Sequence, residues 1–236
     1  MKFSTTEEKF NSLVKYNFWN GNLPQHGFFR TAYLNAIKSY WVKVIVGQRR
    51  TSKRYNLRQI ANDLIANDVH PHNIFYWNKV YIDFDFVNHY SDLGQLINHY
   101  QLTLKTLGEI YLFLDEIQNI AQWEWLVNSY AQDFTESYEV FISGSNSKML
   151  LGELATLLSG RYFNFEIFSL SFDQYTGITQ QNSNYESYIN YMQSVGLPEL
   201  FVFLNEETKR HYVAFVKVTV LLRHVIQRHP IKDPKL

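Results

Sequence analysis

A glycine, a lysine and several arginines crowd into one short segment between an apolar run and a helical pattern, from Gly47 to Arg54. A phosphate-binding loop needs glycine so that backbone N–H groups can wrap the phosphates. It also needs lysine to reach the β- and γ-phosphates, and serine or threonine to bind Mg²⁺. Lys53 occupies the lysine position, while Ser52 replaces the second glycine and Arg54 replaces the hydroxyl residue. An ordinary basic turn is the alternative interpretation. The candidate phosphate-binding residues are Gly47, Arg49, Arg50, Thr51, Ser52, Lys53 and Arg54.

An apolar, strand-like run from Tyr111 to Leu114 ends in two adjacent carboxylates. In phosphoryl-transfer sites an aspartate in this position binds Mg²⁺, which makes Asp115 the candidate metal ligand. The next carboxylate, on Glu116, could act as the general base toward an attacking water. The alternative is a strand end followed by an acidic helix cap. One predicted strand lies between the loop and this motif, and that placement favours the nucleotide site.

Two polar residues further along the chain complete the candidate catalytic set, which is Glu116, Asn146 and Arg161. Asn146 follows another apolar strand, where its side chain or that of Ser145 could contact the γ-phosphate or its water; a helix N-cap is the alternative role. The guanidinium of Arg161 could stabilise transition-state charge, including charge on the nucleotide of a neighbouring subunit. A surface arginine after a glycine helix stop is the alternative for that residue.

Five short apolar runs alternate with helical patterns, which predicts an α/β fold built on a parallel sheet. In such sheets the ligand lies beyond the carboxyl ends of the strands, where the candidate residues also fall. One strand is inserted between the two phosphate motifs, and with right-handed crossovers this predicts the order 5-1-4-3-2. The predicted strands are 41–46, 73–77, 110–114, 139–143 and 162–167. Asp83 and Asp85 alternate along another strand-like segment and are expected on its solvated face.

The net charge, the lack of cysteine and the length of the apolar runs limit the classes of function that this sequence allows. The 22 basic residues balance the 22 acidic ones, so the global charge does not favour nucleic acid, although the loop itself forms a local basic patch. The absence of cysteine excludes disulfides and thiolate metal sites. No apolar run approaches the roughly 20 residues that cross a bilayer. Because no signal-peptide core is visible either, the sequence predicts a cytoplasmic protein without a membrane partner.

Together these motifs resemble a family of bacterial and archaeal AAA-superfamily P-loop ATPases related to the archaeal ATPases and STAND proteins. The resemblance covers roughly residues 28 to 236, and its strongest stretches are 46–50, 112–118, 142–150, 153–161, 170–172 and 196–200. It implies ATP binding, Mg²⁺ dependence and a five-stranded parallel sheet. It also implies Lys53 on phosphate, Asp115 on Mg²⁺, Glu116 as base and Asn146 as a sensor of the γ-phosphate, with Arg161 as an arginine finger.

The phosphate loop departs from the family pattern at two positions. The family has Gly-Lys-Ser or Gly-Lys-Thr where this sequence has Ser52, Lys53 and Arg54. If the first position requires a positive φ, serine there costs about 1 kcal/mol or more. Arg54 removes a metal ligand and places a cation beside a cation, although a guanidinium can itself pair with phosphate. We therefore expect a weakened Mg²⁺ site and weak or lost ATP hydrolysis.

The sequence predicts three regions and two alternative functions. The regions are an N-terminal helical segment over 1–40, a P-loop core over 41–168 and a helical region over 169–236, with 174–195 as a lid over the crevice. Members of the resembling family usually continue into a nuclease-like domain, and residues 219–228 resemble its beginning. We expect this chain to be truncated there, exposing Val216, Val220 and Leu221 and promoting self-association. The alternatives to an ATP-binding protein are a non-catalytic scaffold that binds protein or DNA, and a relic of an ATPase.

Overall fold

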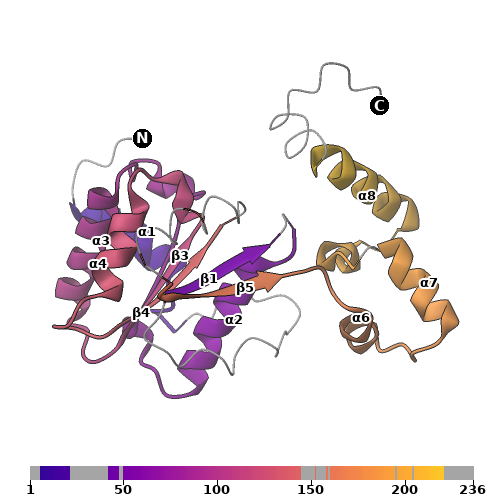
Figure 1. Ribbon diagram of the computed structural model, residues 1–236, viewed down its shortest axis with the longest axis horizontal. Helices are drawn as coiled ribbons and strands as arrows, with labels where there is room; N and C mark the ends of the chain where they lie inside the picture. Colours follow the sequence, from indigo (N-terminus) through magenta and orange to yellow (C-terminus); the bar gives the residue numbers. More distant parts are fainter. Residues whose placement is uncertain are drawn as a thin grey trace. The chain divides into compact units, whose positions relative to one another are not determined.

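The computed structural model describes residues 6–21, 42–47, 50–144, 152, 158, 160–194, 196–203 and 205–220. Its contacts divide the chain into two units (Figure 1). The first holds Met1–Gln48 and Ser52–Ile167, and the second holds Arg49–Thr51 and Phe168–Leu236. The predicted helix over 149–158 lies almost wholly outside the described residues, as do residues 22–40 of the predicted N-terminal segment.

The first unit is built on a parallel sheet whose strands run in the order β2-β3-β4-β1-β5. This is the predicted order, counted from the other edge, and β4 lies between β1 and β3 as expected. The predicted α/β fold class is therefore confirmed, and each strand begins or ends within a residue of its predicted bounds. The strands are β1 (Val42–Gly47), β2 (Ile74–Asn78), β3 (Ile110–Asp115), β4 (Tyr138–Ser143) and β5 (Tyr162–Ile167).

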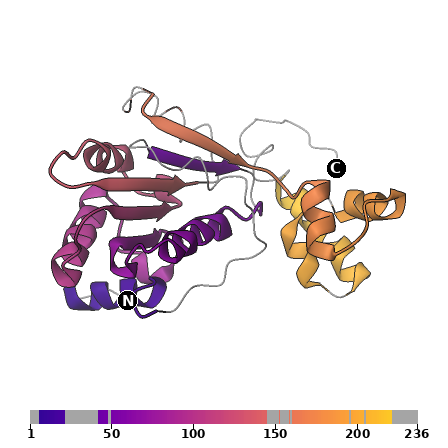
Figure 2. The same ribbon diagram turned by 90° about the horizontal axis from the view of Figure 1, so that it is seen from below.

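Both faces of the sheet are buried by helices, which explains why the strands are apolar on successive residues. Val44 and Val46 of β1 face one core with residues of α1, α3 and α4, whereas Ile45 faces the other core with Leu57 and Ile60 of α2. Figure 2 shows the sheet with α2 running along it. The helices are α1 (Thr6–Tyr16), α2 (Lys53–Ala66), α3 (Tyr90–Leu104) and α4 (Trp123–Ala131).

A buried ion pair joins two central strands. Lys43 of β1 donates a hydrogen bond to the carboxylate of Glu139 on β4, and their side chains are only 1% and 10% exposed. Burial lowers the pKa of Lys43 and raises the pKa of Glu139, because removal from water disfavours both charges. The two side chains neutralise each other's charge inside the core, so the loss of Lys43 would leave the charge of Glu139 buried without a cation.

The segment after β2 corrects one expectation. Asp83 lies in the 3₁₀ helix η3 (Ile82–Phe84) and Asp85 directly follows it, so neither is on a strand. The buried apolar side chains here are Phe84 and Val87, three residues apart, which is a helical rather than a strand spacing. Asp83 is tied to α1, where it accepts hydrogen bonds from Lys15 and Tyr16 at 2.9 and 2.7 Å.

The described part of the second unit is helical. It contains α6 (Phe172–Thr179), α7 (Tyr185–Ser194), the 3₁₀ helix η5 (Pro198–Val202) and α8 (Glu206–Val220). A capping box starts α6: Ser171 Oγ accepts from the Gln174 N–H, and the Gln174 side chain accepts from the Ser171 N–H. Gly196 has φ +60°, and a Cβ there would lie 2.5 Å from the Leu170 carbonyl oxygen. Glycine is therefore required at that turn.

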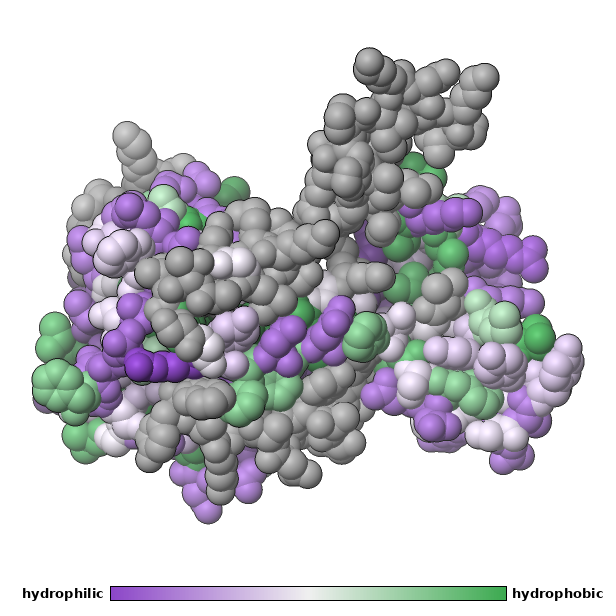
Figure 3. Space-filling model, viewed as in Figure 1, coloured by the Kyte–Doolittle hydropathy of each residue, from purple (hydrophilic) through white to green (hydrophobic). Residues whose placement is uncertain are grey.

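The surface of the second unit mixes polar and apolar side chains (Figure 3). Phe215 and Val218 of α8 are 59% and 45% exposed, whereas Val216, which was expected to be exposed, is half-buried. Leu221 and the side chain of Val220 lie outside the described residues. The predicted self-association stays a prediction. In the described part of the chain, no helix combines the length and the apolar character that crossing a membrane requires.

Candidate nucleotide-binding site

The carboxyl ends of β1, β3 and β4 meet at one edge of the sheet. Asp115, at the end of β3, lies in register with Ser143 at the end of β4, and Ser143 is in turn the register partner of Ile45 on β1. The Glu116 N–H donates to the Ser143 carbonyl at 2.9 Å, and the Gly144 N–H donates to the Ile45 carbonyl at 3.4 Å. The sequence motifs that follow these three strands therefore open from the same edge, where ligands bind in such sheets.

The loop after β1 leads directly into α2, which begins at Lys53. Ser52 is the N-cap residue of this helix and has φ 68° and ψ 25°, in the left-handed region, without a side-chain capping bond. The strain anticipated for serine at this position is therefore present, and it costs about 1 kcal/mol. Lys53 is 8% exposed, and its Nζ donates to the Gly47 carbonyl at 2.8 Å. The lysine thus closes the loop by binding the loop's first residue.

Arg54 forms an ion pair with the carboxylate that was predicted to bind metal. Its Nε lies 3.2 Å from Asp115 Oδ2, and the Asp115 side chain is only 4% exposed whereas that of Arg54 is 41% exposed. Burial alone would lower the pKa of Arg54, but the negative charge of Asp115, helped by Tyr76 and Tyr81, outweighs it and raises that pKa. The residue that replaces the loop hydroxyl therefore neutralises the aspartate directly.

Three further donors surround Asp115. Ser143 Oγ donates to Oδ1, while Asn78 Nδ2 and the Tyr76 hydroxyl, the latter at 3.3 Å, donate to Oδ2. Together with Arg54, these groups engage both carboxylate oxygens. Tyr76 and Asn78 were not predicted as site residues from the sequence. The available signal was a polar residue, Asn78, at the carboxyl end of an apolar strand.

The side chains present here do not fit a Mg²⁺ ion. Mg²⁺ demands oxygen ligands in near-octahedral geometry at about 2.0–2.1 Å. Position 54 offers a guanidinium instead of a hydroxyl, and the oxygens of Asp115 already accept from N–H and O–H donors. Among the residues that the structure describes, no group of three His, Asp or Glu side chains could hold a metal ion.

Glu116, the candidate base, lies directly beyond β3 in the left-handed conformation, with φ 56° and ψ 37°. Its carboxylate accepts a hydrogen bond from Gln118 Nε2 at 2.6 Å. The side chain is half-buried at the same sheet edge as Asp115. A strained backbone at the end of a strand is common at functional sites, because the surrounding fold must hold it in place.

Arg161 lies at the opposite end of the sheet. Its carbonyl accepts from the N–H of Val42, the first residue of β1, and the arginine itself is exposed. At a strand rise of roughly 3.3 Å per residue, β1 places Gly47 about 17 Å further along the strand. The structure therefore does not bring Arg161 to the phosphate loop of its own chain. Asn146 and Arg49 lie outside the described residues.

Arg50 and Thr51 group with the second unit. The Arg50 guanidinium donates to the Tyr212 hydroxyl and lies over the Tyr212 ring, 4.8 Å from its centroid. The same hydroxyl donates to Glu199 at 2.9 Å. Arg50 has φ 68°, so the loop contains a second residue in the left-handed conformation.

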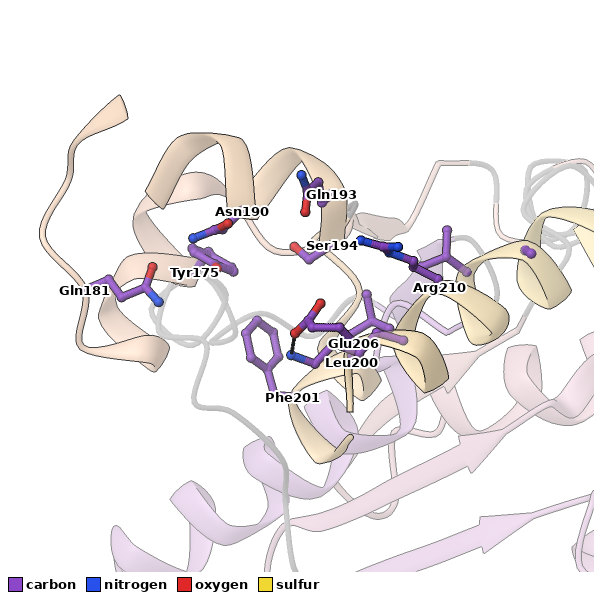
Figure 4. Close-up of a pocket in the computed structure, with 12 residues that line it drawn as sticks. Tyr175, Gln181, Asn190, Gln193, Ser194, Leu200, Phe201, Glu206 and Arg210 are labelled. Carbon is purple, nitrogen blue, oxygen red and sulfur yellow. Dashed lines mark hydrogen bonds and ion pairs between the residues drawn. The ribbon is translucent and has the colours of Figure 1, made fainter. Parts of the chain in front are cut away.

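The second unit also contains an open cavity of about 590 Å³ (Figure 4). The rings of Tyr175 and Phe201 lie with centroids 5.6 Å apart on its lining. Lys209 and Glu206 form an ion pair of 2.6 Å on α8 at its edge. None of the lining residues was predicted from the sequence to bind a ligand, because their types are ordinary for a helical surface.

Comparison with known proteins places these features in a family. A family model described as an AAA domain matches residues 39–176. An uncharacterized protein of Haemophilus influenzae is 31% identical over 197 residues, which is 82% of this chain and 48% of that protein. An uncharacterized protein of Methanocaldococcus jannaschii is 29% identical over 208 residues, 82% of this chain and 44% of that protein. The chain thus spans about half the length of these curated relatives.

Two solved structures resemble the chain distantly. AMPPCP-bound DnaA from Aquifex aeolicus has a TM-score of 0.45 and 12% identity, covering 84% of this chain and 61% of that one. Cdc6p from Pyrobaculum aerophilum has a TM-score of 0.39 and 14% identity, covering 84% and 55%. At these values the fold assignment depends on the chain's own sheet order and loop.

Proposed function

This chain belongs to the AAA domain family of P-loop ATPases, and we propose that it binds ATP at the loop from Gly47 to Arg54. Lys53 opens α2 at the carboxyl edge of the sheet, and a helix N-terminus attracts phosphate through its unpaired N–H groups. On binding, Lys53 exchanges the Gly47 carbonyl for phosphate oxygens. The backbone N–H groups of the loop wrap the phosphates beside it.

The bound ATP is hydrolysed slowly or not at all. In P-loop enzymes, Mg²⁺ is held by the loop hydroxyl and by the aspartate at the end of the strand that carries the second motif. The ion neutralises the negative charge that develops on the phosphates during transfer. In this chain Arg54 stands in place of the hydroxyl residue and forms an ion pair with Asp115, the corresponding aspartate. This ion pair is the main observation in support of the proposal. Glu116 is the base for whatever turnover remains. Asn146 is assigned to the γ-phosphate, and Arg161 is assigned to the nucleotide of a neighbouring molecule.

The proposal is tested by measuring ATP binding by calorimetry and phosphate release in the same protein. We expect measurable binding and turnover far below the ordinary enzyme rate of about 1 per second or above. A Lys53→Ala variant supplies the control for site-specific binding. Ordinary turnover with Mg²⁺, or binding unchanged by Lys53→Ala, would contradict the proposal.

A second candidate function is a scaffold that binds another protein. Large apolar side chains exposed on the second unit favour it, among them Tyr185, Met192 and Phe215, which are 81%, 58% and 59% exposed. If ATP does not bind, the scaffold function becomes the better-supported of the two. Light scattering over a concentration series then separates self-association from a surface that binds a different protein.

A further inference from the structure

Arg54 occupies the loop position where the family has a metal-binding hydroxyl. Its guanidinium forms an ion pair with Asp115, the aspartate that was predicted to bind the metal. We propose that Arg54 replaces the metal ion, so that this site binds nucleoside triphosphates in their metal-free form. This inference rests on the proposed ATP binding and adds the chemical form of the ligand. A metal ion held here would connect Asp115 to the phosphates, and the Arg54 guanidinium can make the same connection.

The contact geometry leaves part of the guanidinium for phosphate. Arg54 uses Nε to bind Asp115, and within the described residues no hydrogen bond engages its two terminal nitrogens. The side chain is 41% exposed although Asp115 behind it is buried, so the outward part of the group faces solvent. A guanidinium carries five N–H donors in a planar fork that matches phosphate oxygens in pairs. Arg54 can therefore hold Asp115 and a phosphate at the same time.

The surroundings hold Arg54 in this position. Its guanidinium lies 5.7 Å from the centroid of the Tyr81 ring, and Arg58, one turn further along α2, donates to the Tyr81 hydroxyl at 2.8 Å. Arg54 is thus fixed between an aromatic ring and a buried carboxylate. Because the group is already oriented, less side-chain freedom is lost when a phosphate binds.

The charges oppose a metal ion and favour a metal-free ligand. Lys53, Arg54 and Arg58 carry three positive charges near the two negative charges of Asp115 and Glu116, so the site has an excess positive charge before any ligand arrives. A Mg²⁺ ion near Asp115 would meet the repulsion of Arg54 and would have to displace the donors Ser143 and Asn78. A triphosphate without metal brings the complementary negative charge and displaces none of these donors.

The test measures ATP affinity by calorimetry in EDTA and again in excess MgCl₂. For the natural protein we expect ATP to bind at least about tenfold more tightly in EDTA than in excess MgCl₂, roughly 1.4 kcal/mol or more, because Mg²⁺ converts ATP into the metal complex that Arg54 opposes. Arg54→Ser, which restores the family's hydroxyl, should weaken binding in EDTA by roughly tenfold to a hundredfold, as expected for one charged hydrogen-bonding partner. The same variant should bind ATP more tightly when Mg²⁺ is added.

Two further variants keep the test decisive. Lys105→Gln is the control, because it removes an exposed cation that follows α3 and precedes β3, at the opposite end of that strand from Asp115; its response to Mg²⁺ should equal that of the natural protein. Arg54→Gln removes the charge but can still donate to Asp115, so it replaces Arg54→Ser if circular dichroism shows that the serine variant is unfolded. It should also lose affinity in EDTA.

The outcomes separate this inference from the proposed function. Binding of the natural protein that is as tight or tighter in excess MgCl₂ than in EDTA overturns the inference and leaves ATP binding intact. Undiminished binding of folded Arg54→Ser or Arg54→Gln in EDTA also overturns it. Absence of ATP binding in both buffers overturns the proposed function itself.

Discussion

Restoring the family's loop by the double change Ser52→Gly with Arg54→Ser should create Mg²⁺-stimulated ATP hydrolysis. Glycine at position 52 removes the strain of φ 68°, which is worth about 1 kcal/mol. Serine at position 54 supplies a hydroxyl for metal and frees Asp115 from its cation. We expect turnover with Mg²⁺ to rise about a hundredfold over the natural protein, equivalent to roughly 3 kcal/mol of transition-state stabilisation.

The stability change of this double variant should be small, because its two parts oppose each other. An exposed ion pair contributes about 0–1 kcal/mol, and breaking a buried one costs about 3–5 kcal/mol. With Arg54 41% exposed and Asp115 still bound by Ser143, Asn78 and Tyr76, we expect a loss of about 1–2 kcal/mol. Relief at Ser52 offsets much of it, so the melting temperature should change by no more than about 4 °C.

The assay is phosphate release with Mg²⁺ and with EDTA, alongside ATP binding and thermal melting. Adding Glu116→Gln to the double variant should reduce turnover by about a hundredfold or more while binding persists, because only the base is lost. A double variant that is folded and binds ATP with Mg²⁺, yet hydrolyses no faster than the natural protein, would refute the argument that Arg54 blocks the reaction. Failure to bind ATP at all would favour the relic interpretation.

Three further predictions concern stability. Lys43→Met should lower the free energy of unfolding by about 3–5 kcal/mol, because it leaves Glu139 buried without a cation. Urea unfolding measures this loss, which should be smaller in the double variant that also carries Glu139→Leu. Gly196→Ala should destabilise the second unit by about 1–3 kcal/mol, since its Cβ would meet a backbone oxygen at 2.5 Å; local amide hydrogen exchange would reveal this, and unchanged protection would contradict it. Burial raises the pKa of Tyr76 and Tyr100, so both stay neutral in the folded protein above pH 10, where unfolded tyrosine ionises. Stability should therefore fall as pH rises above about 10, by up to about 1.4 kcal/mol per pH unit for each such tyrosine; melting temperatures at pH 9 to 11 measure this, and a flat profile would refute it.

The sequence by itself determined the sheet and the candidate edge. Each buried strand is a short, nearly continuous apolar run, because both of its faces are covered, and such runs are visible without any tertiary information. The order of the strands followed from one inserted strand and from the handedness of the crossovers, which is a property of the chain itself. The two defects of the loop, Ser52 and Arg54, were also readable from residue types alone.

The tertiary structure decided what those residues contact. Asp83 and Asp85 were wrongly predicted on a strand, because the same residue pattern also fits a short 3₁₀ helix. The 3₁₀ helix forms here because it buries Phe84 in the core. The sequence could not place Arg161, whereas the hydrogen bond from the Val42 N–H to the Arg161 carbonyl puts it at the far end of the sheet.

Arg54 and Asp115 are distant in sequence, so their ion pair depends on parallel strand register and on the direction in which α2 leaves the loop. The donors Tyr76 and Asn78 reach the same carboxylate because β2 lies beside β3 in register, with Asn78 opposite Asp115. Local sequence fixes residue type and backbone preference. The meeting of a guanidinium with a buried carboxylate requires the packed sheet, because only the sheet sets the distance between them.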